Sequence, residues 1–344
     1  MYDNYIVKED LEMIISQKID FEKLNNKTIL ITGANGLIAS YYTYTLMYLN
    51  DIKKLNIKII LLVRNKEKTL RNIGKRNDIL ILEQDVCDKI EYKEKIDYII
   101  HMASSSNPKT IIDKPVDIIK ANVIGTLNIL NVAKDNNAEI LFTSTREIYG
   151  KVDKNIKEIA EEDYGALKCD ELRSCYPESK RMAENLIISY AYQYNIKYKI
   201  ARIAHTYGPG MSINSDGRIM SDVLEDVIKN RDIVLKSDGQ AIRAFCYIVD
   251  TITALFLITI STLDNQIYNI SNETEEISVK DLAYKVKKIS NKNIDIKFEI
   301  ENDDRKYVKF KRVKLKTKKL EQLGWKPIVD LEKGVERTIK SFEL

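Results

Sequence analysis

A short turn with two glycines, directly behind an apolar run, constrains this chain more than any other feature. Residues 29–31 are apolar, and residues 32–39 read Thr-Gly-Ala-Asn-Gly-Leu-Ile-Ala. A buried strand that breaks at such a turn and continues as a helix is typical of dinucleotide-binding folds. Gly33 permits the tight turn, and Gly36 lets backbone N–H groups approach a pyrophosphate at the helix N-terminus. The motif therefore predicts a strand, a phosphate-binding turn and a helix near the start of the chain.

Strand-like apolar runs alternate with helical patterns after this turn. The runs cover residues 58–63, 79–82, 98–102, 140–143 and 198–203. Helical spacing appears between them, for example over residues 116–133 and 178–194. This alternation predicts an α/β fold with a doubly wound parallel Rossmann sheet and right-handed crossovers. Short strand-like pieces follow at 233–235 and 266–270, and from about residue 273 the pattern becomes irregular and charged.

We expect three parts along the chain. Residues 1–26 carry apolar side chains at roughly helical spacing and form an N-terminal helical extension, packed on the outside of the fold or on a partner subunit. Residues 27–204 together with about 245–272 form the dinucleotide-binding domain. Residues of about 205–244 together with 273–344 form a smaller C-terminal α/β lobe that binds substrate and is interwoven with the first domain.

Composition excludes several classes of protein. The chain has 344 residues, 44% of them hydrophobic, which is enough to bury a full core. Its 55 Lys and Arg nearly balance 51 Asp and Glu, so the net charge of +4 does not indicate a nucleic-acid partner. No apolar run approaches the roughly 20 residues that span a bilayer. The first residues are polar and acidic, unlike a signal peptide, so we expect a cytoplasmic protein without a membrane partner.

The cysteines and histidines give no sign of a metal site. The four cysteines show no metal-like spacing, and only two histidines are present. A histidine-based metal site and a Ser-His-Asp triad are therefore both excluded, and catalysis has to depend on other groups.

A Tyr-x-x-x-Lys pair is the strongest catalytic signal. Tyr176 and Lys180 stand one turn apart on one face of a predicted helix. A phenol with a pKa near 10 is a poor base at neutral pH. A lysine ammonium and an oxidised nicotinamide, both positive, stabilise the phenolate and make it a usable base. The spacing therefore indicates an enzyme that oxidises a hydroxyl group.

The segment 142–150 follows a predicted buried strand and contains three consecutive hydroxyl residues, 143–145. Open parallel sheets bind ligands at the carboxyl ends of their strands. A hydroxyl at this edge is placed to hydrogen-bond the substrate oxygen that Tyr176 deprotonates.

On these motifs the chain resembles the extended short-chain dehydrogenase/reductase family of NAD-dependent nucleotide-sugar epimerases, dehydratases and decarboxylases. The resemblance runs from residue 27 to the end. Within that range the resembling motifs, besides the glycine turn and the segment 142–150, are residues 85–86, 101–104, 122–126, 175–181, 204–210, 242–250 and 323–327.

The resemblance implies roles for individual residues. Tyr176 would remove the proton of the sugar 4-hydroxyl, Lys180 would lower its pKa and bind the nicotinamide ribose, and Thr145 would bind the 4-oxygen. Glu147 would complete the catalytic set. The implied cofactor-binding residues are Gly33, Asn35, Gly36, Leu37, Ile38, Arg64, Asp85, Val86, Met102, Ala103, Ser104 and Asn122, with Tyr176 and Lys180. The implied substrate-binding residues are Arg146, His205, Arg218 and Arg243, of which Arg243 would contact the diphosphate.

Arg146 and Glu147 subdivide the family. In the similar 4,6-dehydratases an Asp-Glu pair stands here, and the Asp supplies a proton to the departing C6 hydroxyl. Arg146 occupies the Asp position and does not release a proton near neutral pH, which argues against dehydration by that route. The similar UDP-glucuronate decarboxylases carry Thr-Ser-Glu at this point and a Cys-Tyr-x-x-x-Lys-Arg segment like residues 175–181.

Two readings of Arg146 stay open: it recruits an acidic group of the sugar, or it faces away and pairs with a glutamate. An arginine that holds a retained carboxylate suits a 4-epimerase. His205 and Gly210 also depart from the Asn and Arg that decarboxylases and dehydratases usually carry.

We therefore predict an enzyme that transiently oxidises C4 of a nucleotide sugar, with UDP-uronate decarboxylation as the nearest specific match. The alternatives are a 4-epimerase, a 4,6-dehydratase and an NADPH-dependent 4-keto-sugar reductase. We expect NAD as cofactor, although Arg64 at the end of the second predicted strand would also suit the 2′-phosphate of NADP. We also expect a homodimer that forms through the helix bearing Tyr176 and the helix before it.

Overall fold

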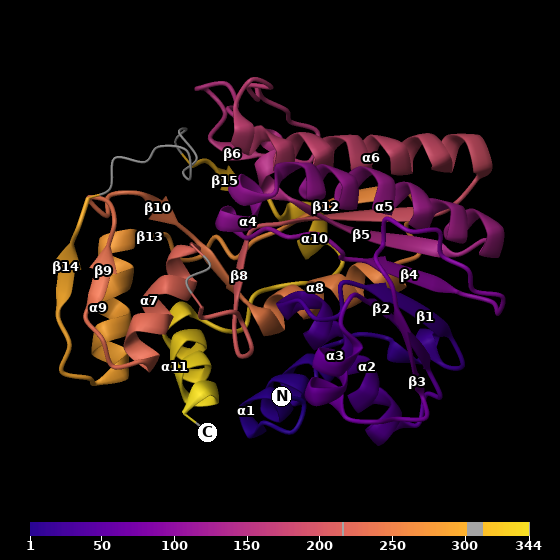
Figure 1. Cartoon of the computed structure of the whole chain (residues 1–344), viewed down its shortest axis with the longest axis horizontal. Coiled ribbons are helices and arrows are strands. Elements are labelled where there is room, and N and C mark those ends of the chain that lie inside the picture. The colour runs from indigo at the N-terminus through magenta and orange to yellow at the C-terminus, as the bar shows by residue number, and fades with distance from the viewer. Residues whose placement is uncertain (215–216, 301–311, 344) are drawn as a thin grey trace.

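A seven-stranded parallel sheet forms the centre of the molecule in a computed structural model that describes residues 1–214, 217–300 and 312–343 (Figure 1). Its strand order is β12-β7-β5-β4-β1-β2-β3. The strands are β1 (Thr28–Thr32), β2 (Lys58–Val63), β3 (Ile79–Glu83), β4 (Tyr98–His101), β5 (Glu139–Thr145), β7 (Tyr198–Ile203) and β12 (Gln266–Ile270). The predicted doubly wound α/β sheet is confirmed, since every neighbouring pair of strands is parallel.

The order in which the chain adds strands to the sheet reverses between β1 and β4. From β1 the chain adds β2 and β3 on one side, then returns to place β4, β5, β7 and β12 on the other. Because crossover connections leave opposite faces on the two sides of this point, a crevice opens at the carboxyl ends of β1 and β4.

Helices cover both faces of the sheet, so the inner strands are buried along most of their length. On one face α5 (Pro115–Asn136) and α6 (Cys175–Tyr194) lie side by side (Figure 1). On the other face lie α2 (Leu37–Lys53) and α8 (Ile248–Ile260), with α1 (Tyr5–Ile15) packed against both. Strand β7 is buried at all six positions, whereas the edge strand β3 has no fully buried residue.

Within the described residues, α5 is the one helix whose length and composition would permit it to cross a bilayer. Its buried residues, among them Ile129, Leu130 and Ala133, belong to the core between the sheet and α6. The helix is therefore accounted for as a core element of the α/β fold.

The N-terminal helix α1 packs one apolar face against the core, and its opposite face carries exposed residues such as Tyr5 and Glu9. Val7, Leu11 and Ile14 of α1 are fully buried. Asp10 of the same helix is also fully buried. Its carboxylate accepts hydrogen bonds from the Tyr41 hydroxyl (2.8 Å), the Tyr247 hydroxyl (2.9 Å) and Arg337 Nε (2.9 Å). These bonds join α1 to α2, to the strand before α8 and to α11 (Leu331–Phe342).

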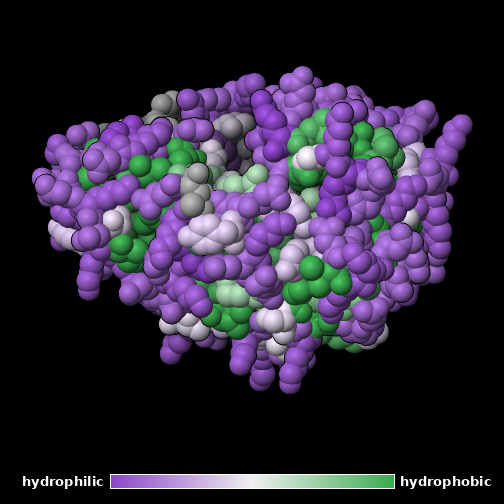
Figure 2. All heavy atoms as spheres, turned by 90° about the horizontal axis from the view of Figure 1, so that it is seen from below, coloured by the Kyte–Doolittle hydropathy of each residue, from purple (hydrophilic) through white to green (hydrophobic). Residues whose placement is uncertain are grey.

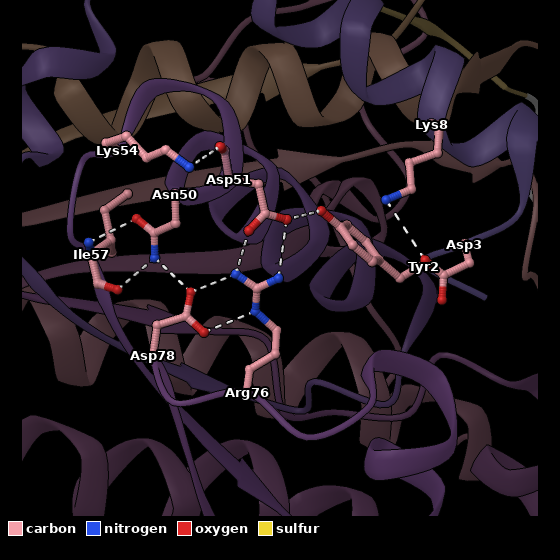
Figure 3. A network of polar contacts seen from close by, with 9 residues as sticks. All are labelled: Tyr2, Asp3, Lys8, Asn50, Asp51, Lys54, Ile57, Arg76 and Asp78. Carbon is pink, nitrogen blue, oxygen red and sulfur yellow. Dashed lines mark hydrogen bonds and ion pairs between the residues drawn. The ribbon is translucent and has the colours of Figure 1, made fainter.

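A second polar network fixes the first residues of the chain to the end of α2 (Figure 3). The Tyr2 hydroxyl donates to Asp51 Oδ2 at 2.7 Å. Arg76 binds Asp51 and Asp78 at once, with one distance of 2.8 Å to each carboxylate. Asn50 donates to the Asp78 carboxylate at 2.9 Å. The turn before β3 is thereby held against α2 and the N-terminus.

The remaining elements include a smaller lobe at the left of Figure 1, which contains α7, α9, β9, β10, β13 and β14, and connecting elements elsewhere in the molecule, with the bounds that follow. The helices are α3 (Lys66–Ile73), α4 (Pro108–Asp113), α7 (Ile219–Ile228), α9 (Val279–Ser290) and α10 (Lys318–Glu321), with 3₁₀ turns η1 (Phe21–Leu24), η2 (Arg146–Tyr149) and η3 (Leu172–Ser174). The strands are β6 (Glu158–Ile159), β8 (His205–Tyr207), β9 (Ile233–Leu235), β10 (Ile242–Arg243), β11 (Phe245–Tyr247), β13 (Ile277–Ser278), β14 (Ile296–Phe298) and β15 (Lys314–Leu315). They pair as β8 with β11, β9 with β14, β10 with β13 and β6 with β15.

Candidate active site

A cavity of about 1100 Å³ opens at the carboxyl ends of the central strands. Residues of β2, β5 and β7 and of the loops that follow β1 and β4 line it on the sheet side, and residues 205, 218, 243 and 312 line it on the side of the smaller lobe. It gathers every sequence-predicted site residue except Asn122.

The turn after β1 forms one end of the cavity and has room for no side chain at its first glycine. Gly33 has φ +72°, and a Cβ there would stand 2.9 Å from both Ala103 Cα and Met102 O. Thr32 Oγ1 accepts the N–H groups of Met102 and Ala103 at 3.1 and 3.0 Å, which holds the loop after β4 against this turn.

The helix that follows begins without a side-chain cap. Gly36 is the N-cap of the 17-residue helix α2 and supplies no side-chain acceptor for the first-turn N–H groups. Those groups, beginning with Leu37 and Ile38, therefore present their N–H dipoles to the cavity, which is the arrangement that binds phosphate.

Three more of the predicted cofactor-binding residues line this end of the cavity. Asn35 donates to the Asn65 carbonyl at 3.1 Å and links the first turn to the end of β2. Asp85 accepts the N–H of Cys87 at 2.9 Å. Arg64, whose side chain is 81% exposed, stands 3.9 Å from the Asp85 carboxylate.

Two polar atoms beside the cavity are buried without a hydrogen-bond partner. They are Ser104 Oγ, on the cavity wall, and Asn122 Oδ1. Asn122 lies behind the wall in α5, where its Nδ2 donates to Ser179 Oγ at 2.8 Å. The glycine cradle, the uncapped helix and the unsatisfied Ser104 hydroxyl together fit a dinucleotide at this end.

The catalytic pair stands at the middle of the cavity. Helix α6 begins at Cys175, so Tyr176 and Lys180 lie one turn apart within its first two turns, and both are buried. Burial is the main cause that raises the pKa of Tyr176, and the Glu147 charge adds to it. A hydrogen bond with Thr145 and the nearby Arg173 act in the opposite direction.

Lys180 has no carboxylate partner within hydrogen-bond distance in the described part of the chain. Its Nζ donates to the Thr143 carbonyl at 2.9 Å and lies 4.4 Å from the centre of the Phe142 ring. Burial lowers the pKa of Lys180 to about 7. The ammonium is therefore held in an environment that a phenolate or an anionic ligand would improve.

His101 lies beneath this pair and adds no charge to it. Thr32 Oγ1 already accepts two N–H groups, so its proton goes to His101 Nδ1 at 2.8 Å. The ring therefore carries its proton on Nε2 and donates to Thr126 Oγ1 at 3.1 Å. Burial lowers the pKa of His101 to about 3, and Lys180 adds to this, so the ring is neutral at physiological pH.

Glu147 is held by an arginine that sequence reasoning missed. Both Glu147 oxygens accept from Arg173, in η3 just before Tyr176, and the NH2–Oε1 distance is 3.0 Å. Arg173 lines the cavity, and its Nε is buried without a partner. The position of Arg173 three residues before Tyr176 was the signal that the sequence offered, but spacing alone does not show that Arg173 pairs with Glu147.

The far end of the cavity is cationic. It is lined by Arg146, Arg218 and Arg243, which were predicted to bind substrate. Arg312, which sequence reasoning missed, lines it too. His205 faces the same space. Burial lowers its pKa well below the ordinary value, and the surrounding arginines, Arg146 first, lower it further.

Within the residues that the structure describes, Arg146 faces the cavity and pairs with no glutamate, contrary to the second interpretation of this residue. It lines the cavity, and its NH2 donates to the Val313 carbonyl at 3.1 Å. Among the residues described, the neighbouring Glu147 pairs with Arg173 instead. The described residues also contain no group of three His, Cys, Asp or Glu that would bind a metal.

Comparison with known proteins places this geometry in context. The sequence model of the NAD dependent epimerase/dehydratase family matches residues 29–271. UDP-glucuronic acid decarboxylase 3 of Arabidopsis thaliana is 36% identical over 93% of this chain and 90% of its own length. UDP-glucuronic acid decarboxylase 1 of Xenopus tropicalis is 32% identical over 97% and 77%.

Solved structures share the fold at lower identity. The epimerase Mth375 of Methanothermobacter thermautotrophicus aligns with a TM-score of 0.82 at 20% identity, covering 96% of this chain and 95% of that one. The UDP-glucuronic acid 4-epimerase of Bacillus cereus, solved with UDP-glucuronic acid and NAD, aligns with a TM-score of 0.76 at 19% identity, covering 92% and 99%.

Proposed function

The chain belongs to the NAD-dependent epimerase/dehydratase family, and from this premise we propose that it decarboxylates a UDP-linked uronic acid after transient oxidation at C4. The protein is an enzyme of nucleotide-sugar metabolism, and its curated relatives at 30–36% identity are UDP-glucuronic acid decarboxylases. One observation carries the proposal beyond the family: the buried Tyr176–Lys180 pair opens directly onto a cationic cavity end. That end suits a sugar nucleotide with more than one anionic group.

Tyr176 begins the reaction by taking the proton of the 4-hydroxyl. The Lys180 ammonium stabilises the phenolate that this step requires, and Thr145 hydrogen-bonds the reacting oxygen. Bound NAD supplies the hydride acceptor. Water is excluded because both side chains of the pair are buried.

Loss of CO2 follows from the position of the new ketone. A C4 carbonyl stands β to the C5 carboxylate, and such acids lose CO2 readily. Negative charge then develops on the C4 oxygen. The Tyr176 hydroxyl, now protonated, and the Thr145 hydroxyl donate to that oxygen and lower the barrier. C5 then takes up a proton, and return of the hydride to C4, with the Tyr176 proton going back to the 4-oxygen, would complete the cycle without an added reductant.

The binding of Glu147 disfavours 4,6-dehydration. That reaction needs a carboxylate to remove the C5 proton and an acid to protonate the departing C6 hydroxyl. Both Glu147 oxygens already accept from Arg173, and the acid position is occupied by Arg146. Decarboxylation requires neither group. A 4-epimerase that acts on the same uronic acid is the second candidate, because Arg146 in the cavity suits a carboxylate that is retained.

We propose NAD in preference to NADP. Arg64, the residue that would bind a 2′-phosphate, lies 3.9 Å from the Asp85 carboxylate. That carboxylate would repel the phosphate, whereas it suits a ribose hydroxyl.

We also propose a homodimer formed through α5 and α6. Apolar side chains more than a third exposed lie along both helices: Val116, Ile119, Ile124 and Leu127 of α5, and Met182, Ile188, Tyr192 and Tyr194 of α6. The view from the opposite side, in Figure 2, is mostly hydrophilic with separate apolar patches. An exposed apolar face that runs along two adjacent helices favours pairing there.

Mass spectrometry of the product after incubation with UDP-glucuronate, without added reductant, tests the reaction. A product lighter by one CO2 is the expected result. An unchanged mass with a new retention time would mean 4-epimerisation, and loss of water would mean dehydration. Turnover only of a 4-keto sugar with added NADPH would identify a reductase and reject transient oxidation.

A further inference from the structure

Four of the arginines that line the cavity fall into two groups by their partners. Arg173 pairs with Glu147, and Arg312 pairs with Glu273 and Glu276. Arg146 and Arg243 form no ion pair with any residue that the structure describes. Their printed hydrogen bonds go to main-chain carbonyls, of Val313 at 3.1 Å and of Ile242 at 2.8 Å.

The unpaired guanidiniums are held under electrostatic stress. Burial lowers the pKa of Arg146 to about 10, and the charges of Arg312 and Arg243 lower it further. Burial and Arg312 lower the pKa of Arg243 as well. A cation in such surroundings raises the free energy of the empty protein, and an anionic ligand removes that cost.

The two residues reach the cavity from different elements. Arg146 follows Thr145 at the carboxyl end of β5, and Thr145 hydrogen-bonds the catalytic Tyr176. Arg146 is thus next to the group that binds the reacting sugar oxygen. Arg243 lies in β10 of the smaller lobe. The pair therefore fits a ligand with two separate anionic groups, one on the sugar and one beyond it.

We infer that Arg146 selects nucleotide sugars that carry a carboxylate on the sugar, whereas Arg243 keeps the diphosphate role that the resemblance to the family implies. This inference rests on the proposed function and names the residue that decides its substrate class. The hydrogen bond to Val313 uses one of the five guanidinium N–H groups and fixes its orientation. The other N–H groups of Arg146 are left to bind a carboxylate.

An ion pair with the substrate carboxylate has a direct consequence for turnover. It stabilises the bound substrate more than the transition state, in which the negative charge moves to the C4 oxygen, so it raises substrate affinity and also raises the barrier to loss of CO2. A neutral pentose product has no group for Arg146 and binds more weakly than the substrate.

Binding to the NAD-loaded protein tests this assignment without turnover. All variants carry Tyr176→Phe, and the probes are UDP-glucuronate and UDP-glucose, measured by titration calorimetry. Charge-assisted hydrogen bonds of this kind predict a preference for UDP-glucuronate of about 10- to 100-fold. Arg146→Gln should abolish the preference and leave UDP-glucose affinity within about threefold. Arg146→Lys, which keeps the charge, should retain part of it.

Arg243→Gln is the matched control, and it should weaken both probes by the same factor. Equal affinity of the parent protein for the two probes would overturn the inference, as would a preference that survives Arg146→Gln. The reaction itself is measured separately. If the protein with Tyr176 intact releases no CO2 while the binding preference depends on Arg146, the proposed reaction is wrong and the role of Arg146 stands.

Discussion

Lys180 should destabilise the folded apoprotein, and its removal should therefore strengthen the fold while destroying catalysis. The pKa of Lys180 falls from 10.5 to about 7 on burial. The unfolded chain thus binds more protons than the folded one between these two values. By linkage, charging this lysine costs on the order of 4 kcal/mol at pH 7, falling to about 3 kcal/mol at pH 8.5. Stability rises with pH across this window, because the folded state loses its proton first.

Replacement of Lys180 with methionine removes the buried charge and keeps the volume. Methionine loses the hydrogen bond to the Thr143 carbonyl, worth about 1 kcal/mol. The expected net gain is about 2 to 4 kcal/mol at pH 7, and the contribution of about 1.5 kcal/mol to the slope between pH 7 and 8.5 disappears. Urea unfolding of NAD-free protein at several pH values measures both quantities.

Lys199 supplies a matched control in the same sheet. Its side chain is 1% exposed, but it pairs with Glu139 and donates to the carbonyls of Thr259 and Ser261. Lys199→Met leaves the Glu139 carboxylate unpaired and should cost about 3 to 5 kcal/mol. If Lys180→Met destabilises the apoprotein as Lys199→Met does, or keeps the parent slope with pH, the buried charge of Lys180 is not the strain we describe.

Three further substitutions probe cofactor binding, chemistry and the core. Tyr176→Phe should lower turnover more than about 100-fold and leave NAD bound, because only the phenolic oxygen is lost. Product analysis measures the turnover, and release of NAD on denaturation measures the bound cofactor. Gly33→Ala should weaken NAD binding at least about tenfold, because its Cβ would lie 2.9 Å from Ala103 Cα at a φ of +72°. Unchanged NAD affinity would contradict the assignment of this turn to the dinucleotide. Asp10→Ala leaves Arg337 Nε and two tyrosine hydroxyls without their acceptor, while Arg337 keeps its ion pair with Glu9, and should cost about 2 to 4 kcal/mol in urea unfolding. A loss below about 1 kcal/mol would mean that water replaces the carboxylate.

The sheet was predictable because its signals are local. Buried parallel strands are mostly apolar, so residues 58–63 and 198–203 mark β2 and β7 at the observed bounds, although Lys199 and Arg202 interrupt the second run. The turn at Gly33 and Gly36 and the spacing of Tyr176 and Lys180 are equally local. These features place the cofactor end and the catalytic pair before any tertiary contact is known.

The charge pairing of the site was not predictable, because it depends on which elements meet. Sequence reasoning left Arg146 free to pair with a glutamate, and Arg173 takes the adjacent Glu147 instead. Arg312 comes from the C-terminal part of the chain and reaches the cavity only through the fold. Asn122 lies behind the cavity wall because its helix turns it toward Ser179. Periodicity predicts which face of a helix is buried, but it does not predict which element that face contacts.

The Asp10 cluster sets the order in which the molecule is completed during synthesis. Asp10 and Arg337, which it binds, are 327 residues apart. A ribosome that adds about 5 to 20 residues per second needs roughly 15 to 65 s to make that interval. Throughout that time the first helix lacks the arginine that neutralises its carboxylate, so it remains open to proteases and chaperones. Its final docking waits for the last helix to leave the ribosome, and only then do the two ends of the chain close the core together.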